Sequence, residues 1–277
     1  MKTLLIFGYI IVSLGHPWQS QRKPDRELDG LLGPVKTVRI EIANLDEEGK
    51  PDKDGRWLSR LTTYNRAGYK TEDETFYDSG KRSNGKFIYT YDDKGNLVEE
   101  AKYLNGSVTK RAFIYNAQGQ LIKEVRRGGV FHADYTYDSE GRLTEIKGIY
   151  GENAVASRFV FTYDEKGQMI KRQRYGGGLD FEEIMIYDSQ GRITSKANGS
   201  NPEDPDYQKV TYSYDTKGNL VEEVGYSNQG REGVNTYRYD FDSTGNWIRR
   251  TALREWDWLL GRRERKAEIT YRTITYY

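Results

Sequence analysis

Apolar and polar side chains alternate along most of this chain, in short runs that end at recurring turn residues. The run Phe87–Tyr91, for example, is followed by Asp92-Asp93-Lys94-Gly95 and then by a second run that begins at Leu97. A period of two is typical of β-strands, whose successive side chains point to opposite faces. The pattern predicts strands of about seven to nine residues joined by tight turns.

These turns belong to a repeated motif, Tyr-Asp/Asn-x-x-Gly-x-apolar. Its copies begin at Tyr64, Tyr91, Tyr115, Tyr137, Tyr163, Tyr187 and Tyr214, and an eighth copy begins with a phenylalanine at Phe241. Successive copies lie 22 to 27 residues apart. A period in this range indicates a repeat architecture in which one supersecondary unit is used again and again.

The motif predicts a three-residue hairpin loop. Asp92 suits the first position of a type I turn, and Gly95 suits a left-handed position that forms a G1 bulge. A residue with a Cβ costs roughly 1–2 kcal/mol in the left-handed conformation, so this glycine is expected to be structural. In this register Tyr91 faces Leu97 across the hairpin.

The two faces of the predicted sheet differ. One carries the motif tyrosine and a large residue two positions earlier, while the other carries smaller residues such as Thr90 and Ile114. The large residues are Tyr89, Phe113, Tyr135, Phe161, Met185, Tyr212 and Tyr239, with Thr62 in the first copy. Because the chain has 23 tyrosines, its core is expected to consist largely of tyrosine rings, with the aromatic face inward.

The predicted fold is all-β, an antiparallel meander of repeated β-hairpins in a curved or spiralling sheet of about 16–18 strands. Motif turns line one rim and Asn/Gly turns line the other. Whether the sheet closes or leaves a groove stays open. The predicted divisions are a signal peptide (1–15), lead-in and capping strands (16–60), eight hairpin repeats (61–250) and a capping hairpin (251–277). Lys266, Glu268 and Arg272 are expected to protect a free sheet edge near the C-terminus.

Composition narrows the functional classes. The chain has 43 basic and 42 acidic residues and a formal net charge of +1, so no basic stripe for nucleic acid or an anionic membrane is expected. It has no cysteine, which excludes disulfides and a cysteine-linked lipid anchor. Lys2, the apolar run Leu4–Leu14 and the small residues Ser13 and Gly15 are typical of a signal peptide. We therefore expect export to the bacterial periplasm or the extracellular space; an uncleaved N-terminal anchor is the alternative.

The string Tyr-x-Tyr-Asp-x-x-Gly-Asn-Leu, present at Tyr89–Leu97 and Tyr212–Leu220, resembles the YD repeat of the RHS-repeat family. Near copies stand at Tyr135–Leu143 and Phe161–Met169, and the resemblance extends over about 61–250. It implies a β-hairpin spiral in an envelope-associated or secreted protein, and some family repeats are linked to carbohydrate binding. The chain lacks the self-cleaving Asp-Pro-x-Gly core region and the C-terminal effector of the large toxin members, so their role does not carry over.

Catalytic signatures are sparse. The chain has two histidines, His16 and His132, and no nucleophile elbow, phosphate loop or dinucleotide fingerprint. We expect no enzyme activity, no cofactor and no structural metal. The acidic loop Asp46–Asp54 could offer oxygens to Ca²⁺, although a solvated turn is the favoured interpretation. Trp256 and Trp258 could stack on a sugar ring, although packing at the end of the sheet is favoured.

The leading functional hypothesis is a binding module for carbohydrate or protein surfaces that uses the variable rim, because insertions between repeats gather there. The candidate binding residues are Tyr103, Asn105, Arg127, Tyr150, Asn153, Tyr175, Asn198, Tyr226 and Asn228. The alternatives are a passive structural component of the cell envelope or of a secreted assembly, and, third, a carboxylate-based hydrolase.

Overall fold

The computed structural model describes residues 23–46, 49–51, 55–77, 79–126, 128, 130–152, 154–257 and 263–277. These residues form one short helix, α1 (Asp25–Leu28), and eighteen strands. The strands are β1 (Val35–Leu45), β2 (Trp57–Tyr64), β3 (Lys70–Tyr77), β4 (Arg82–Tyr91), β5 (Leu97–Leu104), β6 (Ser107–Tyr115), β7 (Leu121–Arg126), β8 (Phe131–Tyr137), β9 (Leu143–Tyr150), β10 (Ala154–Tyr163), β11 (Met169–Tyr175), β12 (Leu179–Tyr187), β13 (Ile193–Ala197), β14 (Gln208–Tyr214), β15 (Leu220–Ser227), β16 (Gly230–Phe241), β17 (Trp247–Asp257) and β18 (Arg263–Tyr276). The predicted signal peptide lies outside the described residues.

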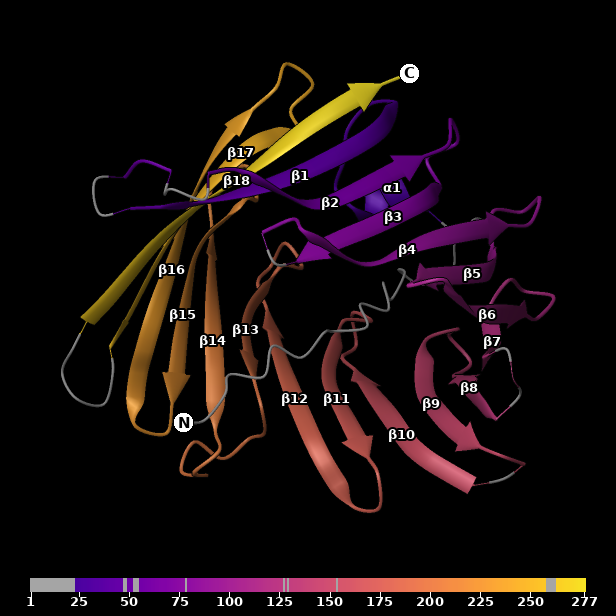
Figure 1. The fold of residues 1–277 in the computed structure, drawn as a ribbon. Coiled ribbons are helices and arrows are strands. Elements are labelled where there is room, and N and C mark those ends of the chain that lie inside the picture. The colour runs from indigo at the N-terminus through magenta and orange to yellow at the C-terminus, as the bar shows by residue number, and fades with distance from the viewer. Residues whose placement is uncertain are drawn as a thin grey trace.

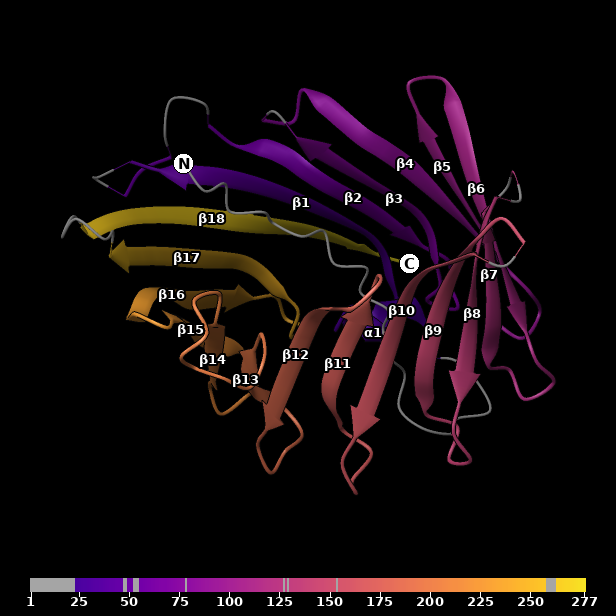
Figure 2. The same cartoon turned by 90° about the horizontal axis from the view of Figure 1, so that it is seen from below.

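The strands form one antiparallel sheet that closes into a ring (Figures 1 and 2). Each strand pairs with the strands before and after it in the chain, and β1 also pairs with β18. The predicted all-β meander is confirmed, and the ring answers the question that the sequence left open. β18 has no free edge, because β17 and β1 pair with its two sides. The expectation that Lys266, Glu268 and Arg272 protect an edge is therefore wrong.

The motif turns have the predicted geometry. The Gly95 amide donates to the Asp92 carbonyl at 3.0 Å, and the Asp92 amide donates to the Asn96 carbonyl at 2.9 Å. The Asp92 carboxylate accepts the amides of Lys94 and Asn96, which satisfies donors that the loop would otherwise leave unpaired. All eight motif glycines have φ between 76° and 95°. Tyr91 lies opposite Leu97, as expected, next to a register shift that marks the bulge.

The aromatic face points into the ring. Tyr64 is 2% exposed and packs with Leu31, Val35 and Val38. The outer face is exposed and carries aliphatic side chains such as Ile114 and Ile186 among charged ones. Ion pairs cross from strand to strand on it, as between Lys110 and Glu99 at 2.5 Å. The large aromatic side chains therefore lie on the inner face, and the outer face combines small aliphatic residues with ion pairs.

The motif tyrosine also joins one hairpin to the one before it. Between successive hairpins the strand pairing stops two residues short of the motif-turn rim: β9 and β10 pair as far as Glu145 and Val160. The Leu143 carbonyl lies beyond this point, and the Tyr163 hydroxyl donates to it at 2.8 Å. Five other copies repeat the bond at 2.7–2.9 Å: Tyr115 to Leu97, Tyr137 to Leu121, Tyr187 to Met169, Tyr214 to Ile193 and Tyr239 to Leu220. Tyrosine is needed here because phenylalanine would leave this carbonyl without a donor.

The copy headed by Phe241 has no phenol at the motif position. There the hydroxyl comes from Tyr239, two residues earlier on the same face, and it reaches the Leu220 carbonyl at 2.9 Å. The bond is therefore kept in the last copy although the motif residue has changed.

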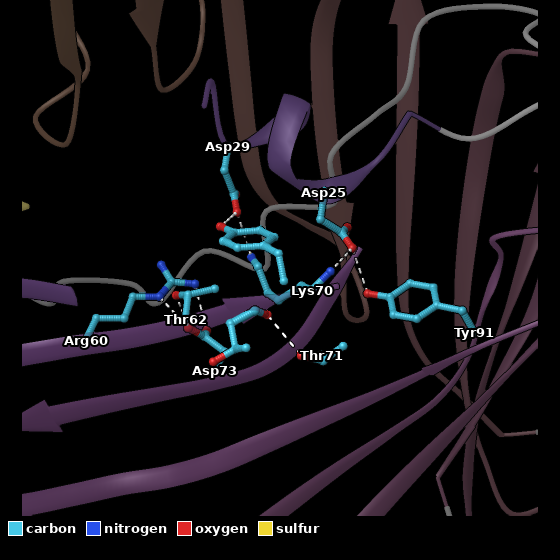
Figure 3. Close-up of polar contacts among 10 residues, drawn as sticks. Asp25, Asp29, Arg60, Thr62, Lys70, Thr71, Asp73 and Tyr91 are labelled. Atoms are coloured by element: carbon cyan, nitrogen blue, oxygen red, sulfur yellow. Dashed lines mark hydrogen bonds and ion pairs between the residues drawn. The ribbon is translucent and has the colours of Figure 1, made fainter. Parts of the chain in front are cut away.

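The first two motif tyrosines bond to the N-terminal lead-in, residues 23–34 before β1, and not to a preceding hairpin (Figure 3). Tyr91 donates to the Asp25 carboxylate at 2.7 Å, and the same oxygen accepts the Lys70 amide at 2.9 Å. Tyr64 donates to Asp29 at 2.5 Å. Further along, Leu32 exchanges two hydrogen bonds with Asn246 of the last motif turn, at 2.8 and 2.9 Å. The lead-in thus bridges the first and last motif turns at this rim.

Candidate functional site

The rim opposite the motif turns carries the variable loops, and two of its hairpin ends lie next to each other. Leu104 pairs with Ser107 across a two-residue turn, in which Asn105 has φ 49° and Gly106 has φ 77°. Two successive residues with positive φ are characteristic of a type I′ turn, for which Asn-Gly is the preferred sequence. The neighbouring hairpin ends where Tyr77 pairs with Arg82.

Between these two ends lies a groove of about 450 Å³, within the size range of small-ligand sites. Its lining consists of Tyr77, Arg82, Ser83, Tyr103, Leu104 and Asn105. Tyr77 is 50% exposed and Tyr103 is 42% exposed, so both rings present surface to solvent. The groove combines aromatic rings with guanidinium, hydroxyl and amide groups that can form hydrogen bonds. Of the predicted candidates, the structure brings Tyr103 and Asn105 together here.

The remaining described candidates lie on other hairpin ends of the same rim. Tyr150 is on β9, Tyr175 on β11 and Tyr226 on β15, and Asn228 is in the turn after β15. Neighbouring strands are about 4.8 Å apart, so these residues are spread around the ring and not gathered at one point. Arg127 and Asn153 lie outside the described residues.

The Asn198 side chain forms hydrogen bonds with the backbone of its own loop. Its side-chain amide donates to the Asp206 carbonyl at 2.7 Å, and its side-chain oxygen accepts the amide of Gln208. Asn198 therefore closes the long loop that contains Asp204, whose carboxylate in turn accepts the Asp206 amide at 2.9 Å.

A second hollow of about 520 Å³ lies between the first two motif turns, near Tyr69 and Tyr91. The polar groups there already serve the fold: Asp92 accepts turn amides, and Tyr91 donates to Asp25. The rim groove is the better candidate for a binding site, because its exposed tyrosines do not belong to the motif.

Sequence reasoning missed a series of inner-face side chains nine residues after each motif aromatic. The series is Asp73, Glu100, Glu124, Ile146, Arg172, Lys196, Glu223 and Arg250. Each lies opposite the large residue that precedes its own motif by two positions, as Glu100 does with Tyr89. The fixed offset could have revealed them. The adjacent residues Glu99 and Glu100 point to opposite faces: Glu99 pairs with Lys110 outside, and Glu100 pairs with Arg111 inside at 2.6 Å.

Among the described residues, no group of three or more histidine, aspartate or glutamate side chains could hold a metal ion. Of the acidic loop, Asp46 is described, and its carboxylate accepts the Lys50 amide at 2.9 Å. Glu47, Glu48, Asp52 and Asp54 lie outside the described residues. Likewise, no helix within the described ranges is long and apolar enough to cross a membrane.

A closed meander of tyrosine-headed hairpins, with a groove on one rim, defines a β-repeat scaffold. The RHS Repeat family model matches residues 115–152, which begin at the last residue of β6 and span two motif turns and the strands β7 to β9. The chain therefore carries RHS repeats, and the resemblance seen in its sequence is confirmed. No curated protein matches the sequence.

Solved structures with a similar course of the chain include a porin-like protein from Bacteroides uniformis, with 14% identity and a TM-score of 0.47, covering 88% of this chain and 99% of that one. The complex TcdB2-TccC3-Cdc42 shows 16% identity and a TM-score of 0.40, covering 84% of this chain and 16% of that one. TcdB2-TccC3 without its hypervariable C-terminal region gives the same identity and coverages and a TM-score of 0.39. At these identities and scores the similarity says nothing about function.

Proposed function

We propose that this protein is an exported, non-catalytic binding module that recognises carbohydrate through the rim groove between β3–β4 and β5–β6. The observation that carries the proposal is the pair of exposed rings, Tyr77 and Tyr103, in one groove with Arg82, Ser83 and Asn105. A sugar ring presents an apolar face edged by hydroxyls. Tyrosine offers flat apolar area at low conformational cost, and the polar neighbours can orient the hydroxyls.

The absence of catalysis is part of the proposal. Two inner-face carboxylates are engaged in ion pairs: Glu100 lies 2.6 Å from Arg111, and Glu183 lies 3.2 Å from Arg172. The predicted signal peptide supports export. The second candidate, a passive structural component, is favoured by the tyrosine–carbonyl bonds, which commit most motif tyrosines to the fold.

The test is a glycan array probed with the wild-type protein and with Tyr77→Ala, Tyr103→Ala and Tyr150→Ala. Tyr150 lies on the same rim and is 58% exposed, but it does not line the groove, so its variant is the matched control. We expect both groove variants to lose at least tenfold in affinity and the control to keep wild-type binding. Binding that survives in both groove variants would exclude the groove. Wild-type protein that binds no glycan but captures a stoichiometric partner in a crosslinking pull-down would overturn the carbohydrate assignment.

A further inference from the structure

One sector of the inner face concentrates positive charge and shares no residue with the rim groove. It consists of Arg60 on β2, Arg250 and Arg254 on β17, and Lys266 and Arg272 on β18, which we call the cationic sector. The strand register places these side chains on the aromatic, inward face: Arg250 lies opposite Tyr239, and Arg60 and Arg272 both lie opposite Ile40.

The cations of this sector differ in their partners. Arg60 binds Asp73 through two hydrogen bonds of 2.7 Å, and Arg254 lies 3.9 Å from Glu268. Arg250 donates at 3.4 Å to the Thr270 hydroxyl, and no described carboxylate lies within ion-pair distance of Arg250 or Arg272. The Nε atoms of both arginines are buried and have no hydrogen-bond acceptor.

Both of these arginines lie close to the same indole. The Arg272 guanidinium carbon is 3.5 Å from the centroid of Trp247, and that of Arg250 is 5.7 Å from it. Burial, with repulsion from Arg250, lowers the pKa of Arg272 to about 10, so the Arg272 side chain stays charged at neutral pH. An unpaired buried charge is unfavourable, and a ligand anion would relieve it.

Solvent reaches this part of the inner face. The side chains of Arg60 and Arg254 are 40% and 48% exposed although they point inward. A small anion can therefore approach from the interior of the ring. Guanidinium groups bind planar or tetrahedral oxyanions through paired N–H donors, which suits carboxylate and phosphate alike.

We propose that Arg250 and Arg272 bind an oxyanion, the carboxylate or phosphate group of a ligand, on the inner face of the ring beside Trp247. The indole supplies an apolar surface for the part of the ligand next to its charged group. This site is separate from the rim groove and does not depend on it.

The experiment is thermal unfolding of the protein titrated with inorganic phosphate and, separately, with glucuronate, at constant ionic strength. Arg250→Gln and Arg272→Gln are compared with Arg249→Gln. Arg249 is on the same strand but faces outward, with a side chain 46% exposed and 3.5 Å from Asp240. We expect a saturable rise of the unfolding temperature in the wild type and in Arg249→Gln, and its loss in both inner-face variants.

Without anion, Arg272→Gln should lose little stability, because the loss of the stack on Trp247 is offset by the removal of a cation whose buried Nε has no acceptor. A merely structural arginine would give the opposite result, and that result would overturn the proposal. So would a wild type that shows no saturable shift with either probe, or a shift that survives in Arg250→Gln and Arg272→Gln. A shift with only one probe identifies the source of the anion. Tyr103→Ala should keep the response, which separates this site from the proposed carbohydrate groove.

Discussion

The bond between the motif tyrosine and the preceding hairpin can be tested by removing one oxygen atom. Tyr163→Phe keeps the ring in place but deletes the hydroxyl that donates to the Leu143 carbonyl at 2.8 Å. Leu143 is 6% exposed, and the pairing of β9 with β10 ends two residues away, so no strand amide takes over. The substitution should therefore leave a buried carbonyl without a donor.

The expected loss can be estimated from the nature of this contact. A hydrogen bond contributes about 0.5–1.5 kcal/mol net, and a buried group left unpaired costs about 1–3 kcal/mol. Tyr163 is only half-buried, so the lower part of that range applies, and we expect a loss of about 1–2 kcal/mol. For a chain of this size, that corresponds to a fall of roughly 2–8 °C in the unfolding temperature.

The assay is urea unfolding at equilibrium, followed by circular dichroism, with Tyr150→Phe as control. Tyr150 is 58% exposed, so its variant should stay within about 0.5 kcal/mol of the wild type. The double variant Phe161→Tyr/Tyr163→Phe copies the arrangement of Tyr239 and Phe241 in the last copy and should regain at least half of the lost stability. Equal stability of Tyr163→Phe and the control would refute the reasoning, and so would a double variant no better than the single one.

Three other predictions concern stability. Gly167→Ala should cost about 1–2 kcal/mol in urea unfolding, because Gly167 has φ 76°; Gly178→Ala, in open space without positive φ, should cost much less, and equal losses would contradict the turn geometry. Asp25→Ala should cost about 2 kcal/mol and speed hydrogen exchange at the Lys70 amide; unchanged exchange would mean that the lead-in is not anchored there. Burial raises the pKa of Tyr137 to about 12, so the unfolded chain, with a pKa near 10, releases that proton first. Stability should be full below pH 10 and fall between pH 10 and 12, and a stability curve flat to pH 12 would contradict this.

The local structure could be read from the sequence because its causes are local. Asp92 and Gly95 determine the hairpin loop by themselves, and the period of two separates Tyr91 from Thr90. Closure of the ring could not be read in this way. The pairing of Thr37 with Thr275 joins residues 238 positions apart, and alternation along a strand does not encode which strand lies beside it.

The candidate site was predictable only in part. Loop variation pointed to the rim on which Tyr103 and Asn105 line the groove, but Tyr77 and Arg82 line it only because the preceding hairpin lies next to it. The charge of the inner face was missed for a different reason. In sequence Arg272 resembles an edge-protecting charge, and only the pairing of β18 on both sides shows that it lies inside a closed sheet.

The seam between β1 and β18 affects how the molecule can be made. Every other pairing joins strands that are neighbours in the chain, so hairpins can form one after another as synthesis proceeds. The seam has to wait for Arg263–Tyr276, which follows the other seventeen described strands in the chain. Until then the growing sheet exposes two unpaired edges, and such edges invite pairing with other chains. Pairing of β1 with β18 is therefore the step that removes both free sheet edges, and with them the main sites for aggregation of the nascent molecule.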